Sequence, residues 1–153
     1  MKSTGGGHRF MQLFFGFAAC SWLPHWACHY YRLETGGPFI VGGWEFSPLD
    51  SIAAMLLYSG LAAFNLIAII SPKIRFPAAL LSAAAHSALG AIHAVRLIHP
   101  FRFEVFGFPW SSASSMREMV MELSLGVLFI IVAFVSRRSS RHGVQVSTHD
   151  LEL

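Results

Sequence analysis

The residues of this sequence best suited to chemistry are ionisable side chains inside long apolar segments. An unpaired charge at the centre of a bilayer costs at least about 2.5–3.5 kcal/mol, so such residues usually serve a function. Depth can be counted from the ends of these segments at about 1.5 Å per residue. Four of the ionisable residues then lie at the same depth, in the half nearer to the two longer loops that connect the segments. They come from four different segments, and they are His25, Tyr58, His93 and Glu122. If the segments form a bundle, this layer predicts a polar pocket that opens outward.

A transition metal is one ligand that suits this layer. Imidazole and carboxylate groups bind iron, copper, zinc or manganese, and helical bundles hold such metals with inward-pointing Glu and His. The candidate metal ligands form two pairs on shared helix faces, because their spacings are two turns and one turn. They are His86, His93, Glu118 and Glu122. The Glu-x-x-His pattern of di-iron proteins is absent from the sequence.

An organic cofactor is the second ligand that suits the layer. A haem could be held between two histidines such as His29 and His93, and a quinone could accept hydrogen bonds from His or Tyr. The candidate cofactor-binding residues are therefore His25, His29, Tyr58, His93 and Glu122.

The same residues also have a purely structural interpretation. Glu122 could pair with His93 or Arg117 to bury its charge, and His86 could bond to a neighbouring helix across a face rich in Ala and Ser. Such small residues let two helix backbones approach closely. The alternatives of packing, cofactor binding and small-ligand transport stay open at this point.

The composition indicates that the segments which carry these residues are membrane helices. Of the 153 residues, 54% are hydrophobic and only 12% are charged, whereas soluble domains carry about 25% charged residues. A helix needs about 20 apolar residues to cross a bilayer. Four segments meet this length, and they are 10–31, 49–70, 76–98 and 116–135. The sequence therefore predicts an all-α integral membrane protein with a bundle of four transmembrane helices.

Basic residues predict the orientation of this bundle. They flank the segments on one side, at Lys2 and Arg9, at Lys73 and Arg75, and at Arg137, Arg138 and Arg141. The positive-inside rule then places both termini in the cytoplasm of a plasma or inner membrane. Topology accounts for the isoelectric point near 9.2, so the expected partners are the lipid bilayer and a membrane protein or second copy, with no nucleic acid.

The chain contains a candidate internal repeat. "HYYRL" from His29 and "HAVRL" from His93 stand 64 residues apart, and 8 of the 23 positions in 29–51 and 93–115 are identical at that offset. Such an offset is typical of duplication. We predict two tandem hairpins in a parallel repeat. The predicted parts are a cytoplasmic tail 1–9, hairpins 10–71 and 72–136, and a polar, disordered tail 137–153.

The two outer loops, 32–48 and 99–115, predict a small β-cap. Both contain the pattern Val-x-Gly-aromatic-x-aromatic-Ser. In the second loop, "FRFEVFGF" alternates partly in polarity as a half-buried strand does, and in the first, "PFIVGGWEF" could be a strand broken by a glycine bulge. The candidate interaction residues of the loops are four aromatics at headgroup level and two arginines that could attract an anion. They are Trp44, Phe46, Phe108, Trp110, Arg32 and Arg96.

These features favour a binding or accessory subunit of a membrane complex. A redox protein that binds metal, haem or quinone and a small-ligand transporter are the alternatives. An enzyme is not favoured, because neither a Ser-His-Asp arrangement nor a phosphate-binding glycine loop is present. Residues 17–20 also resemble the cleavage region of a lipoprotein signal, with Phe17 in place of the usual Leu and Cys20 as the lipidated cysteine.

Overall fold

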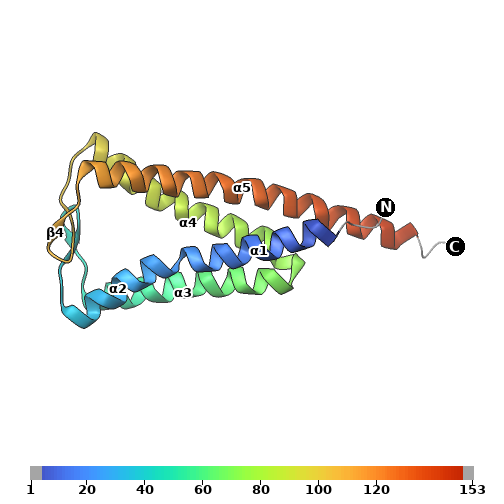
Figure 1. Ribbon diagram of the computed structural model, residues 1–153, viewed down its shortest axis with the longest axis horizontal. Helices are drawn as coiled ribbons and strands as arrows, with labels where there is room; N and C mark the ends of the chain where they lie inside the picture. The colour runs from blue at the N-terminus through green and yellow to red at the C-terminus, as the bar shows by residue number, and fades with distance from the viewer. Residues whose placement is uncertain (1–4, 150–153) are drawn as a thin grey trace.

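The computed structural model describes residues 5–149, and it describes side chains within residues 6–138. The chain is mostly helical, with one small sheet. In chain order the elements are α1 Gly5–Ser21, α2 Leu23–Thr35, β1 Phe39–Val41, β2 Trp44–Glu45, α3 Pro48–Ile70, α4 Pro72–Ile98, β3 Phe103–Val105, β4 Phe108–Pro109 and α5 Ser112–His149. Figure 1 shows the sheet at one end of the molecule, called here the cap end, with the beginning of α1 and the end of α5 at the other.

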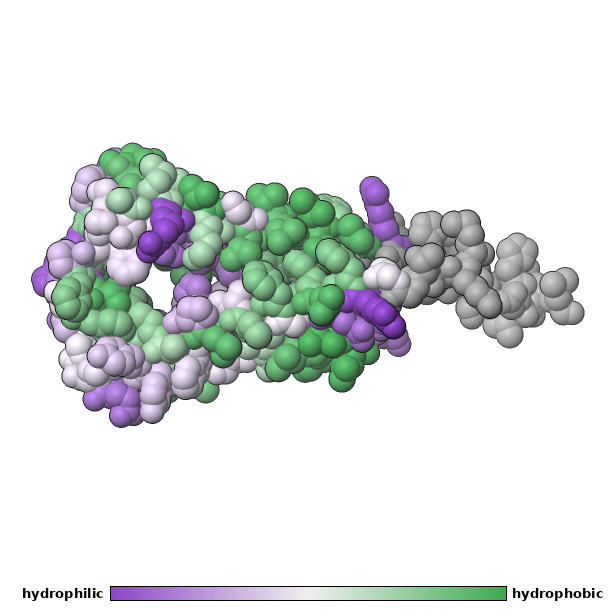
Figure 2. All heavy atoms as spheres, viewed as in Figure 1, coloured by the Kyte–Doolittle hydropathy of each residue, from purple (hydrophilic) through white to green (hydrophobic). Residues whose placement is uncertain are grey.

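Three helices are long and apolar enough to cross a membrane, which supports the prediction of a membrane protein. They are α3, α4 and the Ser112–Arg138 part of α5. Large apolar side chains such as Leu56, Leu66 and Ile131 are exposed on their outer faces. Figure 2 shows apolar side chains along the middle of the face in view, which is the surface that lipid tails would cover.

The first predicted span, 10–31, is divided into two helices. α1 ends at Ser21, and α2 begins at Leu23 with Pro24 in its first turn. Pro24 has no N–H to continue the helical ladder, and its ring disfavours helical geometry at the preceding residue. α2 still continues along the direction of α1 (Figure 1). The division at Trp22 therefore gives this span a local break about halfway along its length.

The last helix is longer than its sequence predicts at both ends. α5 begins at Ser112, where Ser111 accepts a hydrogen bond from the Ser114 N–H at 3.0 Å. It continues to His149, well past the expected end at 135. Residues 137–149 are therefore helical, in contrast to the disordered tail that we predicted. They contain no proline that would stop the helix. The last four residues of that predicted tail lie outside the described residues.

The helices pack as two hairpins that lie side by side. α1 and α2 pack on α3, α4 packs closely on α5, and α3 lies against α4. Glycines allow the tight contact between α4 and α5, because a Cβ atom at Gly90 would lie 2.8 Å from the Leu123 side chain. Between the hairpins, Asn65 of α3 donates to Ser82 Oγ of α4 at 2.9 Å.

The sheet at the cap end joins the two hairpins and confirms the predicted small β-cap, and all its strand pairs are antiparallel. Its order is β2-β1-β3-β4, and the central pair β1 and β3 places Ile40 opposite Glu104. Phe106 and Gly107 both have positive φ, 57° and 81°, which is the conformation of the tight turns that favour two-residue hairpins.

The same contacts recur in both hairpins at the 64-residue offset. The Phe46 N–H donates to the Phe39 carbonyl at 2.9 Å, and the Trp110 N–H donates to the Phe103 carbonyl at 2.8 Å. Across the central strands, the Gly42 N–H bonds to Arg102 at 2.7 Å and the Phe106 N–H bonds to Pro38 at 2.8 Å. Matching positions of the two loops therefore have matching backbone environments.

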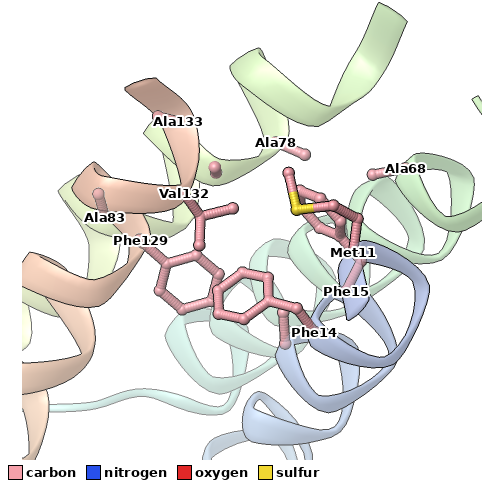
Figure 3. Close-up of a cluster of buried hydrophobic side chains, with 11 residues drawn as sticks. Met11, Phe14, Phe15, Ala68, Ala78, Ala83, Phe129, Val132 and Ala133 are labelled. Carbon is pink, nitrogen blue, oxygen red and sulfur yellow. The ribbon is translucent and has the colours of Figure 1, made fainter. Parts of the chain in front are cut away.

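A packed apolar cluster closes the end of the bundle opposite the cap. It joins α1, α3, α4 and α5, and its largest members are Met11, Phe14, Phe15, Phe129 and Val132. Phe14 and Phe129 meet edge to face with ring centroids 5.1 Å apart, as Figure 3 shows. The two hairpins are thus held together at this end and at the sheet.

Candidate functional site

A large cavity lies between the two hairpins on the cap side of the apolar cluster. Its volume is about 850 Å³, which is within the range of roughly 300–1,000 Å³ for small-molecule sites. Side chains from α1 to α5 and from the sheet line it. Figure 2 shows the opening beside the sheet. Phe17 of α1 and Met121 of α5 line the cavity and are exposed.

Glu122 forms the polar floor of the cavity together with two histidines. Glu122 Oε2 lies 2.6 Å from His86 Nδ1. Its other oxygen, Oε1, lies 3.2 Å from His25 Nε2, at ion-pair distance. Glu122 and His86 are almost fully buried, with 1% and 0% exposure. A buried carboxylate is stable only with such partners, and here they come from α2 and α4.

The sequence predicted different partners for Glu122. His93 does not contact it, because His93 lies nearer the sheet and its Nδ1 is 3.4 Å from Ser115 Oγ. Arg117 pairs with the neighbouring Glu118 at 3.3 Å. His86 takes their place, because α5 begins earlier than its apolar residues indicate and Glu122 therefore lies deeper in the bundle.

Aromatic rings surround the floor of the cavity and reach toward the sheet. Behind the floor, Trp22 stacks on His86 with ring centroids 4.2 Å apart, and the cavity-lining Tyr58 stacks on Trp22 at 5.9 Å. The Tyr58 ring also lies 5.3 Å from His25 and 6.0 Å from His29. Tyr58 of α3 therefore connects the histidines of the floor with those under the sheet.

The roof of the cavity contains two histidines in matching positions. The His29 ring lies 5.0 Å from Phe39 of β1, and the His93 ring lies 5.3 Å from Phe103 of β3. Phe39 and Phe103 lie 6.2 Å apart on the two central strands. The four rings form one continuous surface under the sheet.

Serine and arginine hold each roof histidine in place. His29 Nδ1 lies 3.3 Å from Ser51 Oγ, and Arg32 donates to the same hydroxyl at 3.3 Å. On the other hairpin, Ser115 Oγ lies near His93 Nδ1 and accepts from Arg96. The Nδ1 edge of each imidazole therefore faces the protein.

The two arginines anchor the cap to the helices. Arg32 donates to the Phe46 carbonyl. Arg96 donates to the Trp110 carbonyl and, at 3.2 Å, to that of Ser111. These donors are directed at the backbone of the loops, which gives both arginines a structural role. Attraction of an anion by the same two side chains stays a prediction.

The four loop aromatics divide into two environments. Trp44 and Phe108 are exposed on the cap, while Phe46 and Trp110 are half-buried. Phe46 packs against Phe39 at 4.9 Å. Phe108 and Trp110 also line the cavity.

The candidate cofactor residues lie together, whereas the candidate metal ligands do not form one cluster. His25, His29, Tyr58, His93 and Glu122 all line the cavity. Among the described residues, no three His, Cys, Asp or Glu side chains are arranged to hold a metal ion. Of the candidate metal ligands, His86 and Glu122 are in contact, while Glu118 and His93 line other parts of the cavity.

Sequence reasoning missed Trp22, Ser51 and Ser115 as parts of this site. The two serines were among the identities at the 64-residue offset, and each matched a histidine identity 22 residues earlier. Trp22 and His86 also stand 64 residues apart, but they are different residue types, so identity did not reveal them.

No protein-family model, curated protein or solved structure matches this chain. The residues that line the cavity are therefore the basis for a functional assignment.

Proposed function

We propose that the protein is an integral membrane binding protein whose cavity holds a small ligand that contains a ring. The observation that carries this proposal is the cavity of about 850 Å³ between the hairpins. Its wall and roof are mostly aromatic, and a few polar side chains converge at its floor and roof. Small-molecule sites typically combine an apolar lining with a few placed polar groups.

The proposal includes four membrane spans built from two tandem repeats. α1 and α2 together would form the first span, despite the break at Trp22. Support for the repeat comes from the equivalent hydrogen bonds of the two cap hairpins. The basic residues favour an inner or plasma membrane with both termini in the cytoplasm. The cavity would then lie in the outer half of the bilayer.

Binding is favoured over transport by the position of the apolar cluster. Phe14, Phe15 and Phe129 fill the space between the hairpins on the side away from the cap. A ligand in the cavity would have to separate these rings to pass through. The protein would therefore hold its ligand, and it could do so as the binding subunit of a membrane complex.

Filling the cavity tests this proposal. Leu89 of α4 lines the cavity, whereas Leu80 of the same helix is exposed. Wild type, Leu89→Trp and Leu80→Trp would be purified in mild detergent, and bound small molecules would be detected by native mass spectrometry. We expect a bound molecule in wild type and Leu80→Trp and its loss in Leu89→Trp. Equal occupancy in all three proteins would contradict the proposal.

A further inference from the structure

The roof histidines present their second ring nitrogen, Nε2, to the cavity. Both rings line it, and both are nearly buried by protein on their other sides. Each Nδ1 is taken by a serine hydroxyl. Within the described residues, Nε2 of His29 and His93 has no hydrogen-bond partner. A ligand is therefore the natural partner for both Nε2 atoms.

The arginines determine which hydrogen-bonding role Nε2 plays. Arg32 and Arg96 donate to Ser51 Oγ and Ser115 Oγ, so each hydroxyl accepts there and keeps its own proton to donate. Among the hydrogen-bond partners described for each hydroxyl, Nδ1 of the histidine is the one that can accept this proton. A neutral imidazole that accepts at Nδ1 carries its proton at Nε2. Both histidines are thus N–H donors toward the cavity.

The two donors have matching positions in the two hairpins. They flank the cavity from α2 and α4, and the rings of Phe39 and Phe103 lie between them on the roof. A complementary ligand needs one acceptor at each end of a flat ring. Two opposed carbonyl oxygens on one ring meet this requirement.

We infer that the cavity binds a membrane-dissolved quinone, with its two carbonyl oxygens accepting hydrogen bonds from His29 and His93. This inference rests on the proposed binding function, and it names the ligand class. Phe17 and Met121 line the cavity and are apolar and exposed, so the route of a ligand from the lipid would pass beside them. The same donors match quinone carbonyls better than quinol hydroxyls, and the oxidised form binds more tightly.

A pair of probes separates hydrogen bonding from apolar burial. 1,4-Naphthoquinone has two opposed carbonyls, and naphthalene has the same fused rings without them. Equilibrium dialysis against detergent-solubilised protein, with protein-free micelles as the blank, gives the affinity of each. Tests would use His29→Phe and His93→Phe, which keep an aromatic ring, and His99→Phe as a control on an exposed residue.

We expect naphthoquinone to bind wild type more tightly than naphthalene does. Each Phe variant at position 29 or 93 should weaken naphthoquinone binding about 3- to 10-fold, as expected for one neutral hydrogen bond, without weakening naphthalene. His29→Gln and His93→Gln, which restore an amide donor, should recover part of the affinity. They also keep the test informative if a Phe variant fails to fold.

Other outcomes would overturn the inference. Equal affinity for the two probes, or unchanged naphthoquinone binding in both Phe variants, would leave a binding cavity without quinone recognition. A Soret band in the purified protein that both variants lose would identify haem as the occupant instead. If wild type binds neither probe better than Leu89→Trp does, the proposed binding function fails as well.

Discussion

Trp22 stacks on His86 with ring centroids 4.2 Å apart and planes inclined by 19°, although the two residues stand 64 positions apart in the chain. The contact lies between the cavity floor and the apolar cluster, because His86 also stacks on Phe129 at 5.3 Å. Trp22 thus joins the broken helix α1–α2 to the second hairpin at this depth, beside the pair of His25 and Glu122.

The first prediction concerns this contact. Trp22 is 1% exposed, and Trp→Ala in a core costs about 3–5 kcal/mol. We expect Trp22→Ala to lower the thermal unfolding midpoint in detergent markedly, as followed by circular dichroism. Trp26→Ala is the matched control, because within the described part of the chain Trp26 stacks only on the exposed Tyr30. Equal losses in the two variants would show that the Trp22–His86 stack does not join the halves.

Much of the fold could be predicted from the sequence, because hydropathy and turn residues determine it locally. The apolar segments and the strands of the cap were found in this way. The break at Trp22 was not predicted, since a proline does not by itself decide whether a helix is interrupted. Pro77 stands inside α4 without ending that helix, whereas Pro24 coincides with the break. Membrane helices tolerate proline when neighbouring groups satisfy the freed backbone.

The sequence placed His25, Tyr58, His93 and Glu122 at one depth, and all four line the cavity, but it did not predict which of them are in contact. Depth along a helix depends on where that helix begins, and α5 begins at Ser112 because serines form its polar first turn. Glu122 is then about 15 Å from the start of α5, and His86 is about 18 Å from the end of α4, at about 1.5 Å per residue. The two residues therefore meet, although the apolar pattern placed Glu122 with His93.

The second prediction concerns the floor of the cavity. Removing one partner of a buried pair costs about 3–5 kcal/mol, so Glu122→Ala should destabilise the protein strongly by leaving His86 unpaired. Glu122→Gln keeps an oxygen for His86 and should cost much less. The free energy of unfolding can be measured by denaturant titration in micelles.

Glu118→Ala provides the matched control for these variants. Glu118 pairs with the exposed Arg117, and exposed pairs contribute at most about 1 kcal/mol. Similar losses in Glu118→Ala and Glu122→Ala would show that the contact of Glu122 with His86 contributes little.

The third prediction separates anchoring of the cap from anion binding. Arg96 donates to the Trp110 and Ser111 carbonyls and to Ser115 Oγ. Lysine lacks the planar fork needed for several such bonds. We therefore expect Arg96→Lys to speed hydrogen exchange across residues 101–111, as measured by mass spectrometry. Arg102→Lys is the control, because Arg102 is exposed and pairs only with Glu104 in the described residues. Unchanged exchange in Arg96→Lys would refute the anchoring role.

The fourth prediction concerns the tight packing of α4 on α5. A Cβ atom at Gly90 would lie 2.8 Å from the Leu123 side chain and 3.2 Å from its backbone N, whereas a Cβ atom at Gly60 of α3 meets nothing within 4 Å. Gly→Ala in a helix interior otherwise stabilises by about 0.5–1 kcal/mol. Gly90→Ala should therefore lower the unfolding midpoint, while Gly60→Ala should leave it unchanged or raise it. Because Glu122 precedes Leu123, separating α4 from α5 at this point should also lengthen the contact between Glu122 and His86. A stabilising effect of Gly90→Ala would mean that α4 and α5 are not in close contact there.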